Sequence, residues 1–277
     1  MNALHLSISV ASWALPWDAD APRKGAYTLF NPTPRELMRE MSTDRPDTTE
    51  SPYTVDAGHV QVELSFFDYV RDGDDEAFSV MPTNVKLGLT NTIDVQVVFE
   101  PYIHTRSADP ASPGMIDTDS GLGDTQVRLK INLWGNDEGD SAAAVMPFVQ
   151  LPTAADGIGH GHLEGGVIIP FAISLDEHWG VGLMAEFDAI YNATRDAYDL
   201  EFLHTLAIGR DLIGDLGAYV EYIGVASTAP DSQYQVLLGT GLTYALNADW
   251  RFDAGVNLGL AGGAPDINPF VGMSVRF

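Results

Sequence analysis

The residues best suited to chemistry in this sequence are charged side chains that alternate with apolar ones along extended stretches. Arg128 and Lys130, for example, alternate with Val127, Leu129 and Ile131. Successive side chains of a β-strand point to opposite faces, so the charged and the apolar residues would lie on opposite faces. The residues that this pattern assigns to charged faces are Glu63, Asp94, Glu100, Asp124, Arg128, Lys130, Glu186, Asp188, Glu201, Glu221, Arg251 and Asp253.

These charged faces predict a lumen if the apolar faces of the same strands meet lipid. Charged groups in a closed interior must pair with one another or be hydrated. The charges could therefore act as structural pairs, contact a plug, or set the selectivity of an aqueous pore. The sequence leaves these alternatives open.

Metal binding and cofactor chemistry find little support in the pattern. His160 and His162 share one face of an extended chain, but no third ligand lies nearby, so residues 157–162 are interpreted as a mobile Gly-rich loop. Residues 72–76 and 117–121 are rich in carboxylates and could bind Ca²⁺ weakly, yet neither matches an EF-hand loop. We expect solvated turns there, no metal site and no cofactor.

Nucleophilic catalysis is the main alternative of a different functional class. It needs a Ser, a His and an orienting partner that converge in space. No G-x-S-x-G motif occurs, and His59, His104 and His204 have no evident Ser partner by strand position. His204 lies between Phe202 and Leu206 on an apolar face, which predicts a bulge or a rim position. We expect no enzymatic activity.

The overall composition excludes further classes. The chain has 14 Lys and Arg against 39 Asp and Glu, a formal charge of −25, so it offers no basic surface for nucleic acid. It contains no Cys, which removes disulfides and thiolate chemistry. After the first twenty positions no apolar run is long enough for a membrane-spanning helix. The acidic charge could bridge divalent cations, favour cations in a pore or keep the protein soluble.

The elements that must position the charged faces are strands of about ten residues separated by turns. Ten residues is the length that a tilted strand needs to cross a bilayer. Short connections alternate with longer ones rich in Pro, Gly and Asp, as in an outer-membrane barrel. The expected strands lie near 58–70, 78–89, 92–104, 122–134, 142–151, 163–175, 179–191, 198–210, 216–227, 232–246, 249–260 and 267–277. The predicted fold is an all-β, transmembrane, up-and-down antiparallel β-barrel of about twelve strands, over residues 57–277.

The two ends of the chain carry their own signals. Residues 1–21 have an apolar core and an A-x-A-like site but no basic start, which favours a secretory signal segment over a disordered arm. Residues 22–56 are polar and Pro-rich, so they form a periplasmic or lumenal arm or a disordered leader. As a plug, Asp44, Arg45 and Glu50 could pair with lumenal charges.

The last strand predicts a partner in the cell. Val271, Met273, Val275 and Phe277 share one face, and Phe277 is the last residue. This pattern looks like the signal by which the outer-membrane insertion machinery recognises barrels. A soluble closing strand that ends in Phe is the alternative.

Several motifs resemble those of one family. The opening motif spans residues 43–63 and contains Asp44, Arg45, Pro46, Asp47, Glu50, Ser51 and Pro52. Residues 122–124 and 147–153 are similar to later landmarks. Together they resemble the outer-membrane transporter family of the MetA pathway of phenol degradation. The resemblance implies an outer-membrane barrel that passes small, often aromatic or apolar, compounds.

The sequence as a whole favours a channel or transporter for passive passage of small molecules. It would lie in the outer membrane of a Gram-negative-type bacterium, with the lipid bilayer and a small solute as partners. The alternatives are a structural or anchoring barrel with a sealed lumen and a soluble, two-sheet β protein. The solute, the state of the lumen and the oligomeric state are left open.

Overall fold

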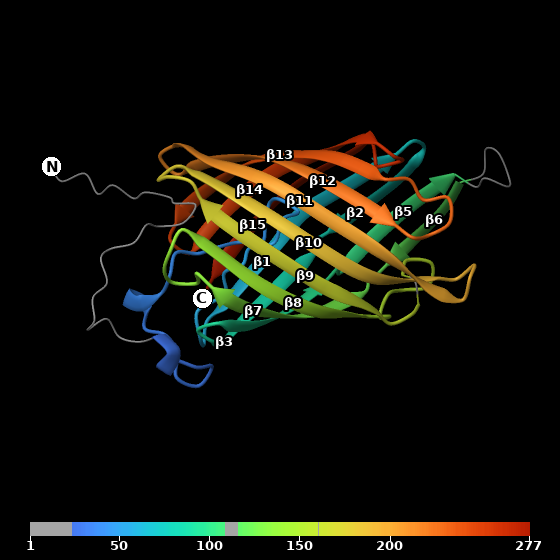
Figure 1. Cartoon of the computed structure of the whole chain (residues 1–277). Helices are drawn as coiled ribbons and strands as arrows, with labels where there is room; N and C mark the ends of the chain where they lie inside the picture. The colour runs from blue at the N-terminus through green and yellow to red at the C-terminus, as the bar shows by residue number, and fades with distance from the viewer. Residues whose placement is uncertain (1–23, 109–115, 160) are drawn as a thin grey trace.

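The computed structural model describes residues 24–108, 116–159 and 161–277, and Figure 1 shows them as a barrel of tilted strands. The expected signal segment, residues 1–21, lies outside the described residues. Ahead of the barrel come two short 3-10 turns, η1 (Lys24–Ala26) and η2 (Arg35–Leu37). No helix in the described part of the chain is long and apolar enough to cross a membrane.

The described strands form one antiparallel sheet that closes on itself, because β15 pairs with β1. Closure gives the strands of the wall neighbours on both sides, except that the strand at residues 116–121 pairs on one side only. The strands are β1 (Val60–Asp72), β2 (Asp75–Val80), β3 (Thr83–Thr90), β4 (Ile93–Phe99), β5 (Tyr102–Ala108), β6 (Ile116–Gly121), β7 (Thr125–Trp134), β8 (Ser141–Leu151), β9 (Glu164–Ser174), β10 (Trp179–Asn192), β11 (Ala197–Ile213), β12 (Leu216–Ser227), β13 (Gln235–Asn247), β14 (Trp250–Ala261) and β15 (Ile267–Arg276).

Three strands of the wall are each divided into two labelled pieces. β2 and β3 both pair with β1, one with each half of it. β5 pairs with β2 while β4 pairs with β3, and β6 pairs with β5 while β7 pairs with β4. Each divided pair is therefore one wall strand, and the barrel has twelve, as the sequence predicted.

The divisions lie side by side and form a row of bulges across four neighbouring strands. In β1 the pairing with β15 shifts between Ser65 and Phe67, and Phe66 and Phe67 are both exposed. The neighbouring strands are interrupted at residues 81–82, 100–101 and 122–124. An inserted residue bends its strand and redirects the side chains beyond it.

The two ends of the barrel differ. One end, called here the turn rim, has tight turns between β3 and β4, β9 and β10, β11 and β12, and β13 and β14. The start of β1 and the end of β15 also lie there, and Phe277 N donates to Val60 O at 2.8 Å. The opposite end, the loop rim, carries residues 193–196, 228–234 and 262–266 between its strands.

The outer face carries the apolar rows that alternation predicted. Trp250 and Phe252 are exposed, and Val127, Leu129 and Ile131 share the outer side of β7 because the alternate residues face inward. Lipid is the solvent that suits such a surface.

His204 corrects one expectation. The sequence predicted a bulge or a rim position, but β11 pairs without a shift with β10 and β12 at this residue. Its ring stacks on Phe202 with centroids 4.9 Å apart, and the Tyr234 hydroxyl lies 2.9 Å from its Nε2. Gly224 on β12 has no Cβ to obstruct the ring. Aromatic neighbours and a hydroxyl therefore accommodate the imidazole on an apolar face.

Candidate functional site

The candidate site is the barrel interior, which the segment before β1 occupies. We call residues 38–57 the arm. Figure 1 shows this blue segment passing from the short helices at the turn rim into the barrel. Its side chains bond to β3, β7, β12 and β14 within a few residues of one another. Strands so far apart in the ring can share one short segment only if it lies inside the ring.

Asp44 lies at the centre of a buried charge cluster. The Lys130 ammonium donates to both Asp44 oxygens, at 2.7 and 3.0 Å, and Lys86 pairs with Asp44 and with Glu63. The Asp44 backbone N–H also donates to Glu63, at 3.0 Å. Burial alone would raise the pKa of Asp44, but the two lysines outweigh it and hold that pKa well below its usual range.

Arg45 ties the arm to the opposite side of the wall. Its guanidinium donates to both oxygens of Asp253 on β14, at 2.7 and 3.2 Å, and to the Ser65 hydroxyl at 2.6 Å. It also lies over the Phe270 ring, 5.7 Å from the centroid. A two-pronged pair of this kind fixes orientation as well as charge.

Glu221 on β12 accepts hydrogen bonds from residues 48 and 49 of the arm. The backbone N–H groups of Thr48 and Thr49 donate to its two oxygens at 2.8 Å each, and the Thr49 hydroxyl adds a bond of 2.6 Å. Asp47 is half-buried near this carboxylate, and desolvation together with Glu221 raises the pKa of Asp47 well above its ordinary value. The arm therefore satisfies a lumenal acid mostly with backbone donors.

Glu50 makes the contact nearest the loop rim. One of its oxygens pairs with the Arg128 guanidinium on β7, and its backbone N–H lies 3.3 Å from the Met184 sulfur. The other oxygen is buried and receives no hydrogen-bond donor. Burial and the nearby Asp44 carboxylate raise the pKa of Glu50 to about 7, although Arg128 opposes this.

The base of the arm is clamped at the turn rim. Arg39, near the start of the arm, bonds to two residues near its end. Its backbone N–H donates to Asp56 at 3.0 Å, and its guanidinium donates to Thr54 O at 2.6 Å. The Val55 backbone N–H donates to Asp94 on β4 at 3.0 Å. Arg39 and Lys24 also pair with Asp137, which lies between β7 and β8. Burial would raise the pKa of Asp137, but these two cations lower it below its ordinary value.

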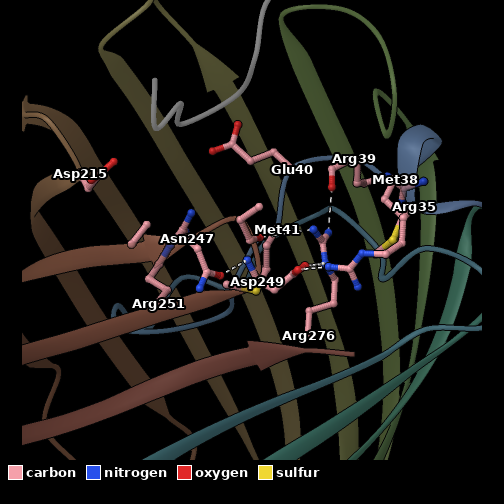
Figure 2. Close-up of a pocket in the computed structure, with 12 residues that line it drawn as sticks. Arg35, Met38, Arg39, Glu40, Met41, Asp215, Asn247, Asp249, Arg251 and Arg276 are labelled. Carbon is pink, nitrogen blue, oxygen red and sulfur yellow. Dashed lines mark hydrogen bonds and ion pairs between the residues drawn. The ribbon is translucent and has the colours of Figure 1, made fainter. Parts of the chain in front are cut away.

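Arg251 and the arm border a cavity of about 370 Å³ at the turn rim. Figure 2 shows Arg276 between Asp249 and the Arg39 carbonyl, with Arg251 on the neighbouring strand. Arg251 donates to the Thr43 hydroxyl at 3.5 Å.

The remaining predicted lumenal residues divide into two groups. Glu63, Asp94, Lys130, Glu221 and Asp253 are almost completely buried and bond to the arm, as Arg128 does. On the loop-rim side, Glu100 and Asp124 line a second cavity of about 340 Å³. Glu186 and Asp188 lie on β10, and Glu201 lies on β11.

The other residues of the arm motif bond within the arm or to the wall. Asp44 accepts a hydrogen bond of 2.9 Å from Ser51 N, and the carbonyl of Pro52 accepts one of 3.0 Å from Asn132. Pro46 follows Arg45 in the peptide chain.

Sequence reasoning missed an apolar stretch of the inner wall. Met146, Phe148, Ile168 and Met184 form a buried cluster on β8, β9 and β10, with Leu203 packed against it. The available signal was that β8 and β9 are apolar on both faces, with few polar alternations. A strand that is apolar on both faces is one that is covered on both faces.

The metal and turn expectations fare differently. The described residues hold no group of three or more His, Cys, Asp or Glu suited to a metal ion. His160, the first member of the predicted pair with His162, lies outside the described residues. Residues 117–121, expected to form a solvated turn, belong instead to β6, where they pair with β5.

Comparison with solved structures shows that this barrel is similar in fold to outer-membrane channels. It is similar in structure to the COG4313 outer membrane channel from Pseudomonas putida F1, with a TM-score of 0.61 and 12% identity over 85% of this chain and 100% of that one. It is also similar to the NanC porin, with a TM-score of 0.53 and 9% identity over 79% of this chain and 100% of that one. At these identities the likeness shows the fold of an outer-membrane channel.

Sequence comparison gives the family. No curated protein sequence matches this chain. The model of the family described as "Putative MetA-pathway of phenol degradation" matches residues 43–277, which include the arm motif and every strand of the barrel. The chain belongs to this family.

Proposed function

We propose that the protein is an outer-membrane channel for the passive passage of small molecules, closed by its arm in the state described above. The turn rim would face the periplasm, since short turns lie on that side of outer-membrane barrels. Solutes with an apolar or aromatic body suit the inner cluster of Met146, Phe148, Ile168 and Met184.

The observation that carries this proposal is the way in which the arm is held. Its contacts with the wall described above are ion pairs and hydrogen bonds that each involve at least one side chain, such as Asp44 with Lys130, Arg45 with Asp253, and the Thr49 backbone N–H with Glu221. In the described residues no wall strand pairs with residues 38–57 as a further strand. The start and the end of the arm also both pass through the turn rim. The arm can therefore leave the lumen while every hydrogen bond between wall strands stays in place.

A sealed structural barrel is the second candidate, and the buried charge cluster favours it. Removing a partner from a buried ion pair costs about 3–5 kcal/mol, and Asp44, Lys86 and Lys130 would all lose partners on release. Water entering the emptied lumen would offset part of this cost. The two candidates therefore differ in whether the empty barrel conducts.

Removing residues 22–55 tests the proposal in planar lipid bilayers. We expect a higher single-channel conductance than in the full chain, with a preference for cations because Glu63, Asp94, Glu221 and Asp253 would lose their arm partners. Removing residues 24–37 alone keeps the arm and serves as the control, with conductance as in the full chain. Unchanged conductance, together with rapid proteolysis of the arm in the intact barrel, would contradict the plug. A barrel without arm that passes no current would favour the sealed candidate.

A further inference from the structure

Arg128 lies between the arm and the cavity on the loop-rim side. That cavity has a volume of about 340 Å³ and is lined by Pro82, Val98, Ile103, Gln126, Arg128 and Gln150, together with the acids Glu100 and Asp124. Arg128 is half-buried and belongs both to this lining and to the ion pair with Glu50. A solute that reaches the cavity from the loop rim would therefore meet Arg128 before it meets the arm.

Glu50 satisfies Arg128 incompletely. Only one Glu50 oxygen pairs with the guanidinium, while a guanidinium can hold a carboxylate with two parallel bonds. The other Glu50 oxygen is buried, receives no donor and interacts with the Asp44 carboxylate. The arm thus presents to Arg128 a carboxylate that makes one bond, where another carboxylate could make two.

An apolar surface adjoins this ion pair. Phe148 lies directly across from Arg128 in the pairing of β7 with β8, and both side chains face inward. Phe148 belongs to the buried cluster with Met146, Ile168 and Met184, and the Glu50 backbone touches Met184. A guanidinium beside Met and Phe side chains is suited to a molecule with an acidic head and an apolar body.

We propose that Glu50 takes the place of a solute's carboxylate, and that a small monocarboxylate with an apolar body binds Arg128 and the Phe148 cluster and thereby releases the arm. This inference rests on the proposed channel function and adds the class of solute and the way in which it opens the channel. The solute would be both the opening signal and the molecule that passes.

Charge around Arg128 supports a carboxylate over an amine. Glu186 and Asp44 act electrostatically on Arg128 in addition to Glu50. When a solute carboxylate replaces an ionised Glu50, the net charge around Arg128 stays the same. An amine would add a second cation next to the guanidinium, and a neutral alcohol would leave the guanidinium without an anion.

Sodium benzoate is the probe, and the full chain in planar bilayers is the system. Added at pH 7 on the side of the loop rim, benzoate should raise the open probability of the full chain. Benzyl alcohol at the same concentration has a similar body without the charge, and we expect no rise from it. Calorimetric titration of the folded protein in detergent measures binding independently of conductance.

Two substitutions separate the head group from general effects. Glu50→Gln removes the competing charge, so benzoate should bind about tenfold more tightly, which is the weight of one charge-assisted bond of about 1.5 kcal/mol. Arg128→Gln should abolish benzoate binding. Arg106→Gln is the matched control, because Arg106 pairs with Glu76 and its side chain is 43% exposed. It should bind benzoate as the unmodified chain does.

The outcomes distinguish this inference from the proposed channel. If benzyl alcohol acts as strongly as benzoate, or if Arg128→Gln binds benzoate normally, the inference is overturned. The same holds if the barrel lacking residues 22–55 conducts while benzoate neither binds nor opens the full chain, and in that case the channel function stands. If the barrel lacking the arm does not conduct, the channel function fails instead, whatever benzoate does in the titration.

Discussion

Single residues decide how strongly the arm is held in the lumen, and Asp44 has the largest share. It is the shared partner of Lys86 and Lys130, both of which are almost completely buried. Buried ammonium groups that lose a carboxylate are strongly destabilised, whereas an exposed pair such as Arg35 with Asp249 contributes little.

Asp44→Asn should therefore weaken docking of the arm by about 3–5 kcal/mol. The measurement is the rate at which a protease cuts the arm in the folded barrel, together with conductance. Arg35→Gln breaks an exposed pair and should change the rate by less than about fivefold, the equivalent of about 1 kcal/mol. Equal protection of the arm in both variants would show that the Asp44 cluster does not hold it.

Glu50 gives the docked arm a pH dependence. Its pKa is raised to about 7 when docked and would return towards 4.5 in a released, hydrated arm. Docking therefore takes up a proton, so this stabilisation is fully present below pH 4.5 and is lost as the pH rises through about 7. Asp47 has the same sign, while Asp44, held ionised by Lys86 and Lys130, has the opposite sign at lower pH.

Open probability should consequently rise between pH 5 and pH 8. The groups around Glu50 are Asp44, Arg128 and Lys130, and the two cations stay charged over this range. Single-channel recording at fixed salt measures the slope, and Glu50→Gln should flatten it. If the two slopes coincide, Glu50 is not the responsible group.

At the level of elements, alternation identified the wall. Each of the twelve expected segments overlaps one wall strand, because a strand with lipid on one side and polar groups on the other must alternate. Alternation could not predict the row of bulges, since an inserted residue such as Phe66 looks like one more apolar residue in β1. It also missed the inner cluster around Met146, where both faces of β8 are apolar.

The arm was harder to predict. Its polar, Pro-rich composition indicates only that it is not a strand, and the same composition suits a disordered leader. Its partners, such as Asp253 for Arg45 and Glu221 for Thr49, lie about two hundred residues away along the chain. Pairs of this kind depend on closure of the barrel, which no local pattern encodes.

Leu129 on β7 tests the orientation of the wall. An Arg in its place would put a charge on the outer face near mid-strand and should weaken insertion by about 2–4 kcal/mol. Leu133→Arg, close to the turn rim on the same face, should cost about 0–1 kcal/mol because the penalty depends on depth. The heat-modifiable mobility of each variant after folding into bilayers reports insertion. Normal folding of Leu129→Arg would contradict the assigned orientation.

At the level of the whole molecule, closure of the barrel brings β15 against β1. Phe277 is 62% exposed and contributes a backbone bond to Val60, so its side chain adds little to packing. Removing Phe277 should impair assembly in cells while refolding in detergent stays nearly unchanged, as expected of a residue read by insertion machinery. Surface abundance and detergent refolding yield are the two measurements. Equal losses in both would assign Phe277 a packing role alone.

The arm enters and leaves the lumen through one rim, and it stays covalently joined to β1. Once released, Glu50 is therefore held close to Arg128 by a short stretch of chain, since each residue spans at most about 3.5 Å. A tethered group of this kind competes as though it were dissolved at millimolar concentration. A free solute must exceed that effective concentration, or bind correspondingly better, before the arm stays out. The barrel would thus respond to a threshold of solute and remain shut at trace levels.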